Sequence, residues 1–170
     1  MRLHAQKDDC PMSETQFPVA PPLLVDRWFN TPHDITLESL RGKVVVVEAF
    51  QMLCPGCVSH GIPQVQRIQA AFVSAEVVVL GLHTVFEHHE AMTPVSLAAF
   101  LHEYKVTFAV GVDRAHESGM PQTMRAYNMQ GTPTLILIDA QGKLRKQWFG
   151  AVSDLVVGAE IMRVVLGEGG

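Results

Sequence analysis

One short segment constrains this chain more than any other: a run of β-branched residues followed closely by two cysteines. The run KVVVVEAF at 43–50 is apolar apart from Lys43 at its start and one glutamate, which is typical of a central strand covered on both faces. The motif C-P-G-C at 54–57 follows, and apolar residues then recur at helical spacing over 56–72, with a kink expected at Pro63. The sequence therefore predicts a strand, a turn and a helix, with Cys54 at the junction.

The rest of the chain alternates between strand and helix patterns. Ser153, and Thr93 or Pro94, stand where helix N-termini are expected. In chain order, the further predicted elements are an edge strand at 23–29, a polar turn or single helical turn at 35–42, a strand at 76–83, a helix at 95–105, a strand at 108–113, a helix at 121–128, a hairpin at 134–150 that turns at 140–142, and a helix at 153–166. This order predicts an α/β fold in which helices flank a central mixed β-sheet.

Length and composition fit one compact domain. The chain has 170 residues, enough for a sizeable core but too few for two ordinary domains, and 48% of them are hydrophobic. We expect residues 23–170 to form this domain. Residues 1–22 are expected to form a flexible N-terminal arm, because they hold four prolines and no helical period. The sequence leaves the oligomeric state unknown.

Charge and hydropathy exclude two classes of partner. Thirteen Lys and Arg against 17 Asp and Glu give a net charge of -4 without a basic run, so we expect no nucleic acid partner. The apolar runs fall far short of the roughly 20 residues that span a bilayer, so we expect no membrane span. The first residues are charged where a signal peptide is apolar. The expected localisation is cytoplasmic for the chain as given, and periplasmic if a leader is missing.

The chemistry suggested by the sequence lies in the cysteine pair. Cys10 stands apart in the N-terminal arm and is interpreted as an incidental thiol. Cys54 and Cys57 are spaced to close a small disulfide. A helix N-terminus points its free N–H groups and positive dipole end at the first cysteine, which favours the thiolate. Cys54 is therefore predicted to be the nucleophile, and Cys57, one turn inside the helix, the resolving thiol.

A metal site is the main alternative for a C-x-x-C pair. Zinc needs two further ligands, and the chain holds no second C-x-x-C. A copper chaperone that uses Cys54, Cys57 and one histidine is a further alternative. Histidines available for either site are His60, His83, His88 and His89, the last three assigned to a polar loop before the next helix. We favour redox chemistry, with no bound metal and no cofactor.

These motifs together resemble the thioredoxin superfamily, and within it the TlpA-like redoxins that are grouped with the alkyl hydroperoxide reductase/thiol-specific antioxidant (AhpC/TSA) proteins. The resemblance covers roughly residues 23–166. It is carried by the strand that leads into the C-P-G-C motif, by Gly-Thr-Pro-Thr at 131–134, and by the hairpin LILIDAQGKLRKQWFG. It implies a thioredoxin-like fold and thiol-disulfide oxidoreductase activity, with protein thiols and disulfides as partners.

The resemblance also implies roles for individual residues. Pro133 matches a cis proline that lies against the cysteine pair and leaves the backbone of Thr132 free to pair with an extended substrate segment. Pro55 and Gly56 complete the expected substrate-binding residues. Glu48 matches a buried acid that takes the proton from the resolving cysteine. A solvent-facing Glu48 remains an alternative, because strand alternation does not fix its face.

Several positions depart from the patterns of related proteins. Leu53 precedes the first cysteine where this family usually has Trp, and His60 stands where many TlpA-like proteins have Glu. Peroxiredoxins carry the motif P-x-x-x-T-x-x-C around the reactive cysteine. This chain has Val47 and Gln51 in place of the Pro and Thr, seven and three residues before Cys54. A peroxiredoxin-like peroxidase is therefore the weaker enzymatic alternative.

Overall fold

The computed structural model describes residues 17–72 and 76–167. Within them, six strands form one sheet in the order β1-β4-β3-β2-β5-β6. The strands are β1 (Val25–Phe29), β2 (Val44–Phe50), β3 (Val77–His83), β4 (Ala109–Asp113), β5 (Thr134–Ile138) and β6 (Leu144–Phe149), and the helices are α1 (Ile62–Ala71), α2 (Pro94–Glu103), α3 (Gln122–Ala126) and α4 (Asp154–Val165). Each predicted element is present, with small shifts at its ends. No helix of the described residues is long and apolar enough to cross a membrane.

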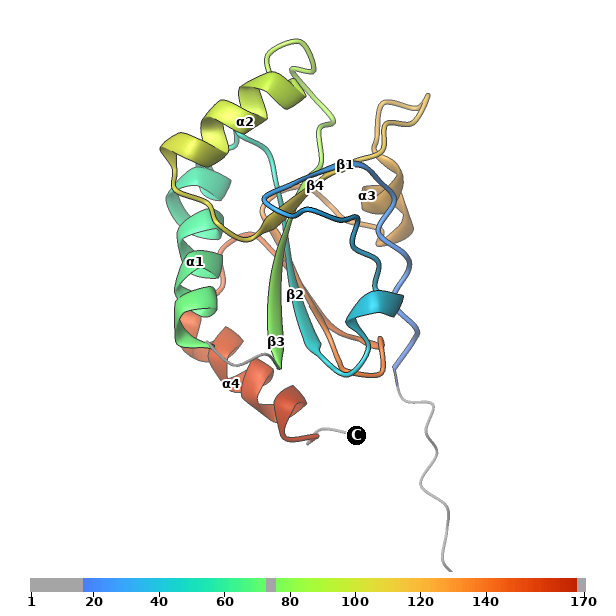
Figure 1. Cartoon of the computed structure of the whole chain (residues 1–170), viewed down its shortest axis with the longest axis vertical. Helices are drawn as coiled ribbons and strands as arrows, with labels where there is room; N and C mark the ends of the chain where they lie inside the picture. Colours follow the sequence, from blue (N-terminus) through green and yellow to red (C-terminus); the bar gives the residue numbers. More distant parts are fainter. Residues whose placement is uncertain (1–16, 73–75, 168–170) are drawn as a thin grey trace, which may run out of the picture.

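The sheet is mixed, as predicted. Strands β2, β3 and β4 run parallel to one another, because helical crossovers connect them. Strands β1, β5 and β6 pair in antiparallel fashion with their neighbours. Helices α1, α2 and α4 cover one face, and α3 lies on the other (Figure 1). The fold is thioredoxin-like.

Strand β2 lies in the middle of the sheet and is buried on both faces. All seven of its residues are buried. Val46 and Phe50 belong to the core cluster shared with α1, α2 and α4, whereas Val47 and Ala49 belong to the cluster that includes Met124 of α3. Full burial explains why this strand is continuously apolar instead of alternating.

The helix after the cysteine motif contains a wide turn where the sequence predicted only a kink. The turn over Cys57–Gly61 is π-helical, and the N–H of Ile62 donates to the carbonyl oxygen of Cys57, five residues earlier. Pro63, the next residue, has no N–H to continue a regular ladder at this point. The structure thus accommodates the proline with a π-turn, and α1 continues from Ile62.

Side-chain caps fix the starts of the two long helices that follow. The Thr93 hydroxyl accepts a hydrogen bond from the N–H of Ser96 at 3.3 Å, and the Ser153 hydroxyl accepts one from the N–H of Val156 at 3.3 Å. Both contacts satisfy backbone donors that the first helical turn leaves free. The predicted N-cap Ser153 is confirmed, and of the two residues expected at the start of α2 it is Thr93 that caps the helix.

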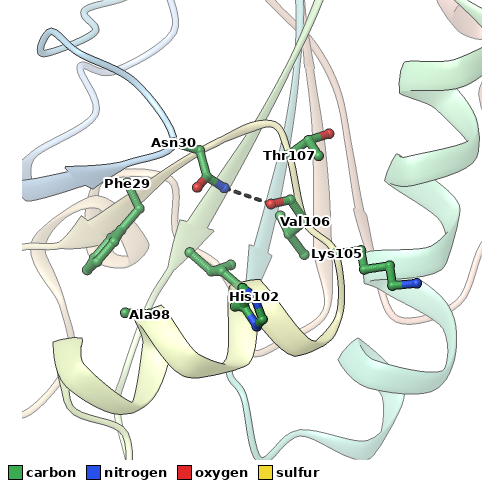
Figure 2. Close-up of a pocket in the computed structure, with 8 residues that line it drawn as sticks. Phe29, Asn30, Ala98, His102, Lys105, Val106 and Thr107 are labelled. Atoms are coloured by element: carbon green, nitrogen blue, oxygen red, sulfur yellow. Dashed lines mark hydrogen bonds between the residues drawn. The ribbon is translucent and has the colours of Figure 1, made fainter.

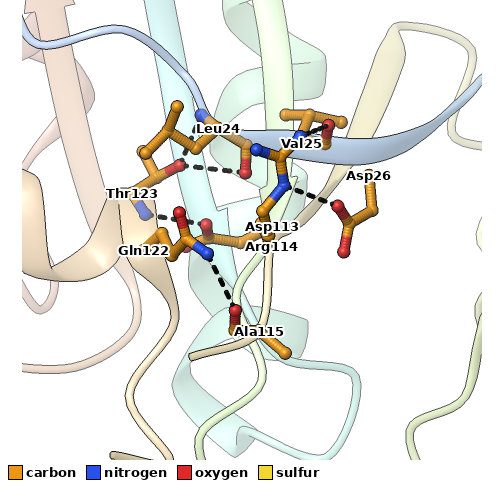
Figure 3. Close-up of polar contacts among 8 residues, drawn as sticks. All are labelled: Leu24, Val25, Asp26, Asp113, Arg114, Ala115, Gln122 and Thr123. Atoms are coloured by element: carbon orange, nitrogen blue, oxygen red, sulfur yellow. Dashed lines mark hydrogen bonds and ion pairs between the residues drawn. The ribbon is translucent and has the colours of Figure 1, made fainter. Parts of the chain in front are cut away.

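A buried carboxylate joins the ends of β3 and β4 to the start of α3. Asp113 accepts hydrogen bonds from the N–H of Thr123 at 2.8 Å, the N–H of Met124 at 3.0 Å and the hydroxyl of Thr84 at 2.9 Å. Figure 3 shows the contact of Asp113 with Thr123 beside the ion pair between Arg114 and Asp26, 2.7 Å apart. The bonds of Asp113 hold the ends of β3 and β4 against the start of α3.

The described end of the expected N-terminal arm lies against the rest of the chain. The N–H of Ala20 donates to the carbonyl oxygen of Gly142 in the β5–β6 turn at 2.9 Å. The hydroxyl of Tyr127 donates to the carbonyl oxygen of Pro21 at 2.6 Å. Residues 17–22 therefore contact the sheet and its loops, while 1–16 lie outside the described residues.

A cavity of about 380 Å³ opens between β1, α2 and the segment that follows α2 (Figure 2). Asn30 holds its wall by donating from Nδ2 to the carbonyl oxygens of Val106 at 2.8 Å and Phe108 at 3.1 Å. The lining residues are Phe29, Asn30, Ala98, Leu101, His102, Lys105, Val106 and Thr107. None of them belongs to the cysteine motif.

Candidate active site

Cys54 and Cys57 lie just beyond the C-terminal end of β2. The helical turn begins at Pro55, so Cys54 precedes the first helical residue, as predicted. The N–H of Val58 donates to the carbonyl oxygen of Cys54 at 3.1 Å, which places Cys54 at the cap of this turn. Cys54 is half-buried, whereas Cys57 is fully buried. The two thiols therefore differ in access to a partner.

Sγ of Cys54 has two backbone hydrogen-bond partners, and the Cys57 thiol has a raised pKa. Both cysteines are free thiols in this structure. The N–H of Cys57 donates to Sγ of Cys54 at 3.3 Å, and this Sγ donates to the carbonyl oxygen of Thr132 at 3.4 Å. Burial, followed by the contact with Cys54, raises the pKa of the Cys57 thiol far above its usual value. At neutral pH Cys57 is thus a protonated thiol.

The loop before β5 packs against Cys54 and the helical segment that follows it. The peptide bond between Thr132 and Pro133 is cis, as the resemblance implied. Pro133 is buried, and a Cβ placed on Gly56 would lie 3.2 Å from Cδ of its ring. Pro55 is exposed beside this contact. The structure therefore brings all four expected substrate-binding residues together around Cys54.

Glu48 points from β2 towards the start of α1. It alternates with Val47 and Ala49, so it shares the face of Val46 and Phe50, and it is only 1% exposed. The solvent-facing alternative is therefore wrong. Its Oε1 is buried without a hydrogen-bond partner among the described atoms. Burial, and secondarily the negative charge of Cys54, raise the pKa of Glu48 well above its ordinary value.

His83 is buried. It is the last residue of β3, as the predicted strand at 76–83 implied, and does not belong to the polar loop to which it was also assigned. It pairs in register with Phe50 and is 1% exposed. Its ring lies 5.3 Å from the ring of Phe50, and its Nε2 has no hydrogen-bond partner among the described atoms. Burial lowers the pKa of His83 to about 4, so the imidazole is neutral at pH 7.

Two polar side chains near the cysteines hold neighbouring loops. Gln51, at the position where peroxiredoxins have Thr, is buried and accepts a hydrogen bond from the N–H of Phe86 at 3.2 Å. A ring nitrogen of His60 lies 3.1 Å from the carbonyl oxygen of Val152, just before α4. Both side chains are engaged with backbone groups of these loops.

The histidines considered for the alternative metal site do not form such a site with the cysteines in the described part of the chain. Within 17–72 and 76–167, no group of three or more His, Cys, Asp or Glu side chains is arranged to hold a metal ion. The site consists of two thiols, one buried carboxyl and a cis proline.

A mixed sheet, a C-x-x-C pair at a helix start and a cis proline against that pair together define a thioredoxin-like redox protein. The family model described as AhpC/TSA matches residues 21–147, and the chain belongs to this family. It is thus a redoxin of the thioredoxin superfamily.

Two solved structures and two curated proteins illustrate this relationship. The crystal structure of a thioredoxin-like superfamily protein is 61% identical, with a TM-score of 0.86, covering 89% of this chain and 97% of that one. A thiol-disulfide isomerase from Corynebacterium glutamicum is 46% identical, with a TM-score of 0.84, covering 88% of this chain and 97% of that one. Protein DipZ of Mycobacterium bovis and of Mycobacterium tuberculosis is 29% identical over 143 residues, 83% of this chain and 19% of DipZ. The chain spans about a fifth of these curated relatives.

Gly61 also contributes to the site, although no sequence motif pointed to it. This buried glycine is the last residue of the π-turn and lies against the Glu48 carboxyl and Pro133. A glycine inside a helical pattern was the available signal, since such a residue often has a packing reason.

Proposed function

We propose that this thiol-disulfide oxidoreductase uses Cys54 as nucleophile and Cys57 as resolving thiol to exchange electrons with disulfides of partner proteins. One observation supports the assignment: Cys54 is half-buried and hydrogen-bonded at the start of a helical segment, whereas Cys57 is fully buried. The similar Corynebacterium glutamicum protein, described as a thiol-disulfide isomerase, supports the same reaction class.

In the first step the Cys54 thiolate attacks one sulfur of a partner disulfide. The new S–S bond joins Cys54 to the partner, and the partner's second sulfur leaves as a thiolate. The hydrogen bond from the N–H of Cys57 stabilises negative charge on Cys54 before the attack.

In the second step Cys57 loses its proton and attacks Sγ of Cys54. The mixed disulfide breaks, the Cys54–Cys57 disulfide forms, and the partner leaves with both sulfurs reduced. Two electrons pass from the cysteine pair to the partner, and the reverse sequence oxidises a partner dithiol. Since burial keeps Cys57 protonated, this step needs a base, and the proposed base is Glu48.

Thr132 and Pro133 are proposed to hold the partner segment. The carbonyl oxygen of Thr132 lies within hydrogen-bond distance of Sγ of Cys54, so an extended chain that pairs with Thr132 presents its sulfur to Cys54. Pro55 and Gly56 border the same surface.

The experiment is trapping with glutathione disulfide, read by intact mass and peptide mapping. All proteins carry Cys10→Ser, so that glutathione can add only at Cys54 or Cys57. Cys57→Ser should retain one glutathione on Cys54, because nothing resolves the mixed disulfide. Wild-type protein should end as the internal disulfide, and Cys54→Ser should stay largely unmodified. The assigned roles would be refuted if glutathione added to Cys57 in the Cys54→Ser protein as fast as it adds to Cys54 in the Cys57→Ser protein.

A further inference from the structure

Gly61 has no backbone reason to be glycine. Its φ of -57° and ψ of -58° are ordinary helical values that any residue adopts. Inside a helical segment glycine is less favourable than alanine, because more backbone entropy is lost on folding. A reason for glycine must therefore be sought in the space around it.

That space is occupied by two residues of the candidate active site. A Cβ on Gly61 would collide with Oε1 of Glu48 and lie 3.2 Å from Cβ of Pro133. The same Oε1 is buried and has no hydrogen-bond partner among the described atoms. The bare backbone of Gly61 thus forms one wall of the slot that holds the Glu48 carboxyl.

The wall is part of the turn that carries the resolving cysteine. The π-turn runs from Cys57 to Gly61 and is closed by the hydrogen bond from Ile62 to the carbonyl oxygen of Cys57. Gly61 therefore links three parts of the site: the Cys57 turn, the Glu48 strand and the Pro133 loop. Single π-turns of this kind occur frequently at functional sites.

We propose that Gly61 is a positioning residue that lets the Glu48 carboxyl lie, dehydrated, against the Cys57 turn, where it takes the Cys57 proton. This inference rests on the proposed function, because it acts through the step in which Cys57 resolves the mixed disulfide. A side chain at Gly61 displaces the carboxyl, and a displaced, hydrated carboxylate is a weaker base.

The test separates the two sulfur steps with Ellman's reagent in stopped flow. All proteins carry Cys10→Ser, so that only Cys54 and Cys57 can react with the reagent. The first thionitrobenzoate is released when Cys54 attacks the reagent, and the second when Cys57 displaces the thionitrobenzoate that remains in the mixed disulfide with Cys54. Gly61→Ala should leave the first rate within about twofold and slow the second at neutral pH by roughly tenfold or more. Gly158→Ala is the matched control, because Gly158 lies in a helix with open space around it, and both rates should stay as in wild type.

Two further variants make the test specific. Glu48→Gln should slow the second release as Gly61→Ala does, and combining the two should slow it no further. Gly61→Ala with Glu48→Asp should recover part of the rate, because the shorter side chain leaves room for the new methyl group. A purely structural role of Gly61 would give neither result.

Each failure has its own signature. A normal second release in Gly61→Ala, with a slow one in Glu48→Gln, overturns the inference and leaves Glu48 as the base. A normal second release in Glu48→Gln refutes the proposed base itself. If Gly61→Ala folds poorly, the stability lost through this substitution is measured both in the wild-type background and in a Glu48→Ala background. A loss that disappears with Glu48→Ala supports the collision between the new methyl group and the carboxyl. An equal loss in both backgrounds overturns the inference.

Discussion

Replacing His83 with phenylalanine should remove a defined part of the acid sensitivity of this fold. The folded pKa of His83 is about 4, against an ordinary 6.5, so between these values the unfolded chain binds more protons than the folded one. The stability that the neutral His83 contributes is therefore complete above pH 6.5 and is lost as the pH falls towards 4. Between pH 7 and pH 5 the loss from this one residue is about 2 kcal/mol.

The assay is urea unfolding of both proteins at pH 7 and pH 5, with the cysteines kept reduced. Phenylalanine preserves a ring beside Phe50 and cannot titrate, whereas all other titrating groups are common to both proteins. Subtracting the two pH dependences therefore isolates His83. The variant should lose about 2 kcal/mol less than wild type over this interval. An equal loss in the two proteins would refute the assignment of His83 as a buried neutral imidazole.

Three further variants test other buried or capping groups. Glu48→Gln should gain stability relative to wild type as the pH rises from 5 to 8. The raised pKa of Glu48 means that ionisation of this carboxyl favours the unfolded wild-type chain, and glutamine removes that effect. Urea unfolding across this range measures the difference in stability, and a difference that does not change with pH would contradict the prediction. Asp113→Ala should lower the free energy of unfolding by about 3 kcal/mol or more, because the buried N–H groups of Thr123 and Met124 and the hydroxyl of Thr84 lose their acceptor. A loss below about 1 kcal/mol at pH 7 would argue against a stabilising role of these three hydrogen bonds. Ser153→Ala should lose about 1 kcal/mol, and an unchanged thermal midpoint would speak against its capping role.

The order of elements could be predicted because each has a strong local signal. The run at 43–50 is long, apolar and β-branched, and two helix starts carry cap residues in Thr93 and Ser153. The position of Cys54 followed directly, because a strand, a turn and a helix leave only one place for it.

Other features depended on contacts between distant parts of the chain. The face of Glu48 was undetermined, because a strand buried on both sides has no polar alternation from which to infer it. His83 ends an apolar run, so the sequence pattern fits a loop start as well as a buried strand end. The role of Gly61 requires Glu48 and Pro133 to meet it in space, which no local pattern contains.

The central claim is that Cys54 and Cys57 form a working redox couple, and its reduction potential tests this most directly. The protein is equilibrated in glutathione buffers, free thiols are trapped, and Cys54→Ser serves as the control. We predict one reversible two-electron transition between roughly -270 and -120 mV, absent from the control. Absence of any reversible transition in the wild-type protein would contradict the account.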